Sequence, residues 1–66
     1  MKKSLRPELT RLLTDAREKK KLTQAEVGKR TGMSKNYYAR IERGDINVSH
    51  DKLKKIAEVL GLKLLR

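Results

Sequence analysis

Cysteine is absent from this chain of 66 residues, and histidine occurs once, at His50. The lack of cysteine excludes disulfides, zinc sites built on thiolates and a cysteine nucleophile. The lone histidine has no carboxylates near it at a metal-binding spacing, so we expect no metal and no cofactor. A nucleophile, a base and an orienting acid do not stand together either, and we therefore expect no enzymatic activity.

Aromatic residues and long apolar runs are also scarce. The chain has two tyrosines and neither phenylalanine nor tryptophan. Single-stranded RNA is usually bound by stacking its bases on exposed aromatic rings, so this composition disfavours an RNA-binding module. No apolar run is long enough for a membrane span or a secretory signal, which makes a cytoplasmic protein the expectation.

Positive charge is what the chain has in excess. Eighteen lysines and arginines face eight acidic residues, which gives a net charge of +10. Such an excess raises the affinity for polyanions through the release of counterions. Charge alone does not decide between DNA, RNA and an anionic membrane surface. A chain of this length has room for one domain with one small core.

The first third of the chain predicts a basic arm over residues 1–6 and then a helix from about Pro7 to Lys20. Proline suits the first turn of a helix, where its missing N–H is no loss. The apolar residues that follow one helical face are Leu5, Leu9, Leu12, Leu13 and Ala16. The basic end of this helix complements the negative end of the helix dipole.

Three further helices are predicted from their start and stop signals. Thr23 and Glu26 have the spacing of a capping box, in which each side chain binds the backbone N–H of the other. Ser34 and Ser49 occupy equivalent starting positions, and a glycine follows each helix where a left-handed residue is needed. The predicted spans are Gln24–Thr31, Lys35–Arg43 and His50–Leu60, ending at Gly32, Gly44 and Gly61. Because nothing between Pro7 and Gly61 alternates like a strand, residues 7–61 are expected to form a compact all-α domain of four helices.

The tail over residues 62–66 allows two interpretations. Leu62 and Leu64 alternate with a lysine, and Leu65 follows. These leucines either close the core of the monomer or pair, as a strand or a hydrophobic patch, with the same tail of a second subunit. Under the second interpretation the tail is a fifth structural element and the dimer contact.

From about Leu9 to Leu62 the chain resembles the phage-repressor family of helix-turn-helix proteins, also called Cro-like or xenobiotic-response-element (XRE) proteins. The matching residues are Leu22-Thr23-Gln24, Glu26, Gly28, Gly32-Met33-Ser34, Arg40-Ile41-Glu42, Gly44, Ser49, Leu53, Ile56-Ala57 and Leu60-Gly61. The resemblance implies a lambda-repressor-like DNA-binding domain. The residues expected to hold the helix pair together are Val27, Gly28, Gly32, Tyr38 and Ile41. The resemblance also implies an internal ion pair between Arg17 and Glu42.

Helical geometry, at about 100° per residue, divides the segment 35–43 into two sides. Tyr37, Tyr38 and Ile41 cluster on one side, and the opposite side carries Lys35, Asn36, Ala39, Arg40 and Arg43. Lysine and arginine donate to guanine, asparagine pairs with adenine, and an alanine methyl packs on thymine. Base-reading is therefore expected of Lys35, Asn36, Ala39 and Arg40. Tyr37 lies at the edge, where it either packs or contacts the DNA.

Other residues are expected to bind phosphates, which position a protein on DNA without reading its sequence. Gln24 opens the second helix at a positive helix end. In the family this glutamine binds a phosphate and braces the first residue of the recognition helix, here Lys35. The other expected phosphate contacts are Thr23, Ser34 and Arg43.

The sequence thus predicts a sequence-specific regulator of transcription that binds double-stranded DNA. We expect a homodimer, because one helix pair reads too few base pairs to be selective and paired half-sites overcome this. A repressor is the expected form. The alternative is the antitoxin of a toxin–antitoxin pair, which would have a toxin protein as a second partner and would also repress its own promoter.

Overall fold

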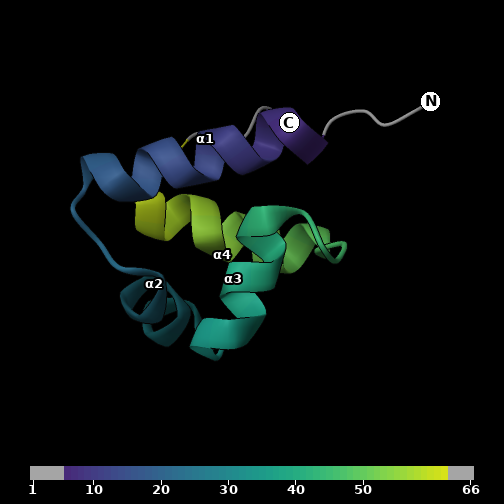
Figure 1. The fold of residues 1–66 in the computed structure, drawn as a ribbon. Coiled ribbons are helices and arrows are strands. Elements are labelled where there is room, and N and C mark those ends of the chain that lie inside the picture. The colour runs from purple at the N-terminus through teal and green to yellow at the C-terminus, as the bar shows by residue number, and fades with distance from the viewer. Residues whose placement is uncertain (1–5, 63–66) are drawn as a thin grey trace.

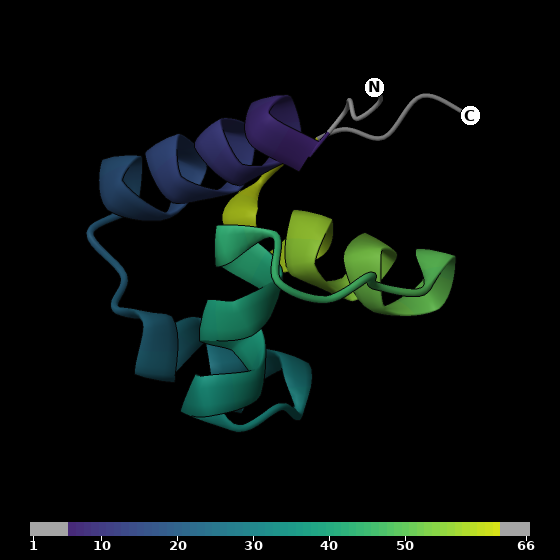
Figure 2. The same ribbon diagram turned by 45° about the vertical axis from the view of Figure 1, so that its right-hand side comes forward.

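The computed structural model describes residues 6–62, and within that range the chain forms four α-helices. These are α1 (Arg6–Lys19), α2 (Gln24–Thr31), α3 (Lys35–Arg43) and α4 (His50–Leu60). In Figures 1 and 2, α1 lies along the top of the molecule and α4 lies below it. One end of α3 lies just below α1, and α2 and the other end of α3 form the bottom of the molecule. The all-α fold is confirmed, and α1 begins and ends one residue earlier than predicted.

The predicted caps explain where three of the helices begin. Thr23, Ser34 and Ser49 have extended backbones, and each side chain accepts from the backbone N–H three residues later. The backbone N–H groups of the first turn have no partner within the helix, so these side chains satisfy one of them in each case. Each of the three helices ends at a glycine with a left-handed backbone.

The end of α1 is different because it has no glycine. Lys21 adopts a φ of 60°, the left-handed conformation that costs energy for a residue with a Cβ. Its N–H donates to the Glu18 carbonyl at 2.9 Å, and the Leu22 N–H donates to the Arg17 carbonyl at 3.1 Å. These bonds satisfy the last carbonyls of α1 and turn the chain toward α2.

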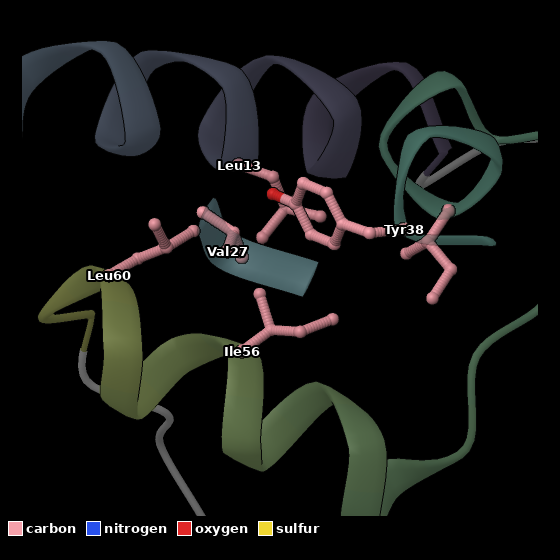
Figure 3. Packing of buried hydrophobic residues seen from close by; sticks show 6 residues of the cluster. Leu13, Val27, Tyr38, Ile56 and Leu60 are labelled. Carbon is pink, nitrogen blue, oxygen red and sulfur yellow. The ribbon is translucent and has the colours of Figure 1, made fainter. Parts of the chain in front are cut away.

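One hydrophobic cluster joins the four helices. Its buried members are Leu13, Val27, Tyr38, Ile41, Ile56 and Leu60. Figure 3 shows the ring of Tyr38 lying between α1 and α4, with Leu13 above it and Ile56 below. Burial of such side chains is the main term favouring the fold, at roughly 1.5–3 kcal/mol for each large residue.

Leu12 does not follow its predicted place on the buried face of α1. It is 49% exposed, whereas its neighbour Leu13 is completely buried. The apolar residues of α1 span an arc wider than the core, so a residue at the edge of that arc faces solvent. Leu62, the last described residue, is half-buried and packs against the core cluster. Leu5, Leu64 and Leu65 lie outside the described residues, as does most of the basic arm.

None of the described helices combines the length and the hydrophobicity that crossing a membrane requires.

Candidate nucleic-acid interface

The exposed side of α3 carries most of the polar residues predicted to read bases. Lys35, Asn36 and Arg40 are exposed, and Tyr37 is half-buried at the edge of the core. Tyr38, Ile41 and Glu42 face inward from the opposite side. Two cations and one amide therefore project from one helix face, which is the combination that donates to guanine and pairs with adenine in a major groove.

Ala39 is a correction to the predicted face. Its side chain is 8% exposed, so it belongs with the buried residues of α3. The prediction used only the angular position of each residue around the helix. It assumed that neighbouring helices cover the side with Tyr38 and Ile41 and leave the opposite side exposed. In the structure α3 contacts both α1 and α2, and the covered arc is wider. A thymine methyl has little of Ala39 to pack against.

The turn between α2 and α3 depends on two glycines. A Cβ on Gly28 would lie 2.8 Å from the Met33 carbonyl oxygen and 3.1 Å from that of Ser34. Both atoms belong to backbone that cannot move independently of the turn. Gly32 has a φ of 77°, and its N–H donates to the end of α2. The lack of a side chain on Gly28 therefore allows the close approach of α2 and α3.

The N-terminal end of α2 is fixed by the predicted capping box. The Thr23 hydroxyl accepts from the Glu26 N–H at 3.0 Å, and the Thr23 N–H donates to Oε1 of Glu26 at 2.8 Å. The bond from the Thr23 backbone lowers the pKa of Glu26. The Thr23 hydroxyl is thus engaged within the protein, although the residue is exposed and its O–H proton can still be donated.

Gln24 makes a side-chain hydrogen bond that the family resemblance did not imply. Its Nε2 donates to Oε1 of Glu42 at 3.0 Å, and the side chain is half-buried. The bond joins the first residue of α2 to the last turn of α3. The second N–H of the same amide group is left for another acceptor.

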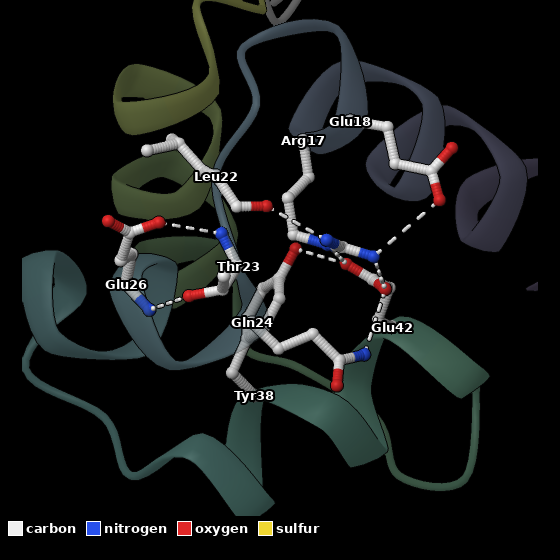
Figure 4. A network of polar contacts seen from close by, with 8 residues as sticks. All are labelled: Arg17, Glu18, Leu22, Thr23, Gln24, Glu26, Tyr38 and Glu42. Carbon is white, nitrogen blue, oxygen red and sulfur yellow. Dashed lines mark hydrogen bonds and ion pairs between the residues drawn. The ribbon is translucent and has the colours of Figure 1, made fainter.

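Glu42 is the centre of a buried polar cluster, drawn in Figure 4. Besides Gln24, its carboxylate accepts from Arg17 Nε at 2.9 Å, from the second terminal nitrogen of Arg17 at 3.2 Å, and from the Tyr38 hydroxyl at 2.8 Å. The ion pair expected between Arg17 and Glu42 is therefore present. Arg17 also donates to the Leu22 carbonyl at 2.9 Å. Three helices and the α1–α2 connection meet at this carboxylate.

The cluster also decides how its members ionise. Burial alone would raise the pKa of Glu42, but the hydrogen bonds from Arg17, Tyr38 and Gln24 outweigh it and hold that pKa below its ordinary value. Burial, together with the bond to Glu42, raises the pKa of the Tyr38 hydroxyl. Both residues therefore keep their usual forms, carboxylate and phenol, over a wide range of pH.

Sequence reasoning did not single out two residues beside this surface. Asp45 accepts from Nε of Arg43 at 3.0 Å, just after α3 ends. Lys52 of α4 places its ammonium group 5.7 Å from the centre of the Tyr37 ring, a cation–π distance. The first contact could have been predicted from the sequence, because Arg43 and Asp45 carry opposite charges on either side of Gly44. The second joins separate helices, and no local pattern indicates it.

A strongly basic chain that has a helix-turn-helix and an exposed polar face on α3 is typical of DNA-binding regulatory domains. Comparison with family models gives the same answer: the helix-turn-helix model matches residues 13–65. The chain belongs to this family, in its XRE branch, and is a DNA-binding transcription regulator. A search of curated proteins found no match, and neither did a search of solved structures.

Proposed function

We propose that this protein is a sequence-specific regulator that inserts α3 into the major groove of double-stranded DNA and represses transcription by occupying its site. The observation that carries the proposal is the outward projection of Lys35, Asn36 and Arg40 from one face of α3. Direct base reading needs side-chain donors and acceptors presented together on an element that fits the groove, and a single α-helix fits.

The phosphate contacts are assigned to residues at the ends of α2 and α3. Gln24 offers its second amide N–H beside the N-terminal N–H groups of α2, and Ser34 caps the start of α3. Arg43 is exposed in the last turn of α3. Because Glu42 holds the Gln24 side chain, the distance between Gln24 and the base-reading face of α3 is already fixed in the free protein. This preorganisation lowers the entropic cost of binding DNA.

The test begins with selection of bound duplexes from a random DNA library, followed by titration of a selected and a scrambled duplex. Arg40→Ala is expected to weaken binding to the selected duplex by about 1–3 kcal/mol and to relax the preference at one base pair. Gln24→Ala is expected to weaken binding to both duplexes alike. Equal affinity of the wild-type chain for both duplexes would refute sequence-specific reading.

Lys54→Ala is a charge-matched control for Arg40→Ala. Lys54 is exposed on α4 and lies outside the proposed reading face. Removing its charge reduces long-range attraction to DNA without touching a base contact. The preference for individual base pairs should then stay as in the wild type, and a loss equal to that of Arg40→Ala would mean that charge alone explains the Arg40 effect.

We propose further that two copies bind together. A dimer on a two-fold-symmetric site would place half-sites about 34 Å apart, and a footprint would reveal that spacing. The half-exposed Leu12 offers apolar surface for such a contact, and Leu64 and Leu65, which the sequence analysis also considered for it, lie outside the described residues. Sedimentation equilibrium over a range of concentrations tests it. A stable complex with a second, different protein in native cells would instead support the antitoxin alternative.

A further inference from the structure

A contact between α3 and α4 brings a cation to the edge of the proposed reading face. The Lys52 ammonium lies 5.7 Å from the centre of the Tyr37 ring, a distance at which the face of the ring attracts a positive charge. Tyr37 is the third residue of α3, and Lys52 is the third residue of α4. The side chain of Lys52 therefore reaches from the first turn of α4 to the first turn of α3.

The first turn of α3 is the part of the helix that would lie closest to the bases. In helix-turn-helix proteins the N-terminal residues of the recognition helix contact base edges in the major groove. Lys35 and Asn36 are exposed in this turn, whereas Tyr37 is half-buried at the edge of the core. A cation beside the Tyr37 ring consequently lies at one side of the reading face, where a phosphate backbone forms the wall of the groove.

The Lys52 ammonium has no ion-pair partner in the part of the chain that the structure describes. Lys52 is exposed, and none of the ion pairs among residues 6–62 includes it. An ammonium has three N–H donors, and attraction to the face of a ring uses no conventional acceptor. A phosphate could therefore bind Lys52 without breaking the contact with Tyr37. Arg43 differs, because its guanidinium already binds the carboxylate of Asp45.

The stability of α4 does not explain a lysine at this position. Ser49 caps α4 in the same way as Thr23 caps α2. Lys52 then corresponds to Glu26, whose carboxylate completes the capping box of α2. A lysine has no acceptor for the N–H of the N-cap residue, and the positive end of the helix dipole disfavours its charge. What this lysine adds is a cation beside α3.

We propose that Lys52 is a phosphate-binding residue of the DNA interface and that the Tyr37 ring positions its ammonium for this contact. The inference rests on the proposed function, because the phosphate comes within reach only when α3 lies in the major groove. A contact with a backbone phosphate strengthens binding to every duplex and adds no sequence preference. The ring limits the conformations of a flexible side chain in the free protein, which reduces the entropy lost on binding.

The test compares Lys52→Gln with the wild type on a selected and a scrambled duplex at several salt concentrations. Glutamine removes the charge and suits the third position of a helix that begins with a capping serine, so thermal unfolding should show no loss of stability. We expect the affinity for both duplexes to fall about fivefold near physiological salt. The slope of log affinity against log salt should become shallower by about one.

Two results with Lys52→Gln would overturn the assignment. An affinity and a salt slope equal to those of the wild type would mean that Lys52 does not bind a phosphate. A relaxed preference at one base pair would mean that it reads a base instead.

Lys54→Gln is the matched control. Lys54 is exposed on the same helix, but it lies about 200° around the helix axis from Lys52. The variant removes the same charge and should change either affinity by less than about twofold. A loss as large as that of Lys52→Gln would overturn the proposal, because net charge alone would then explain both.

A Tyr37→Leu background tests the part played by the ring. Leucine keeps an apolar side chain at the edge of the core but offers no aromatic face to the ammonium. In this background Lys52→Gln should lower the affinity by about twofold instead of about fivefold. An equal loss in both backgrounds would overturn the positioning role of Tyr37.

The outcomes separate this inference from the proposed function. Failure of the wild type to distinguish the two duplexes would refute sequence-specific reading before any variant is measured. If the wild type distinguishes them and Lys52→Gln binds both as the wild type does, only the contact of Lys52 is refuted.

Discussion

Glu42→Gln is expected to be among the most destabilising single substitutions in this domain. The change keeps the shape of the side chain but removes the charge on which Arg17, Gln24 and Tyr38 converge. The side chains of Arg17 and Glu42 are 15% and 5% exposed, so the guanidinium would lose its counter-charge where water hardly reaches. The new amide group would also direct N–H donors toward other donors.

The magnitude follows from this burial. Removing one partner of a buried ion pair costs about 3–5 kcal/mol, because an unpaired charge is left behind. Arg17 keeps its bond to the Leu22 carbonyl, which places the expected cost near the lower limit, at about 3 kcal/mol. A domain of this size has a free energy of unfolding of roughly 5 kcal/mol, so more than half of its stability would be lost.

Urea unfolding followed by circular dichroism measures the effect. The midpoint should fall while the slope stays the same, since the surface exposed on unfolding is unchanged. The triple variant Arg17→Met, Tyr38→Phe, Glu42→Leu replaces the buried polar groups together and should lose less than Glu42→Gln alone. A free energy of unfolding of Glu42→Gln within about 0.5 kcal/mol of the wild type would refute the reasoning, because surface substitutions have effects of that size.

Four other predictions concern the turns and the pH dependence. Gly28→Ala should lower the free energy of unfolding by about 1 kcal/mol, because overpacking against the Met33 carbonyl exceeds the gain in helix propensity; thermal unfolding checks it, and a gain would contradict it. Lys21→Gly should raise that free energy by about 0.5 kcal/mol in the same assay, because it relieves a left-handed backbone; a loss would count against this strain. Urea titrations over pH should show stability present above the ordinary glutamate pKa of 4.5 and lost as pH falls below it, because the pKa of Glu42 is lowered in the fold. Tyr38 has the opposite shift, so its contribution is present below pH 10 and lost as pH rises further; Tyr38→Phe should remove the alkaline loss, and its persistence would exclude Tyr38 as the source.

The helices and their limits could be predicted from the sequence, because the signals that set them are local. A cap such as Thr23 and a terminating glycine such as Gly32 act on backbone groups within a few residues. Three of the four spans were therefore predicted to the residue. The family resemblance added the ion pair between Arg17 and Glu42, which joins positions 25 residues apart.

The packing of the helices against one another sets which side chains are buried and which hydrogen bonds they make. Ala39 is buried and Leu12 exposed because burial depends on how many neighbouring helices cover a face, which no helical wheel contains. Gln24 binds Glu42 because the packing of α2 against α3 brings that carboxylate within reach. The proposed reading face of Lys35, Asn36 and Arg40 could be predicted from the sequence. The full buried cluster around Glu42 could not, because its side chains come from three helices that only the tertiary structure brings together.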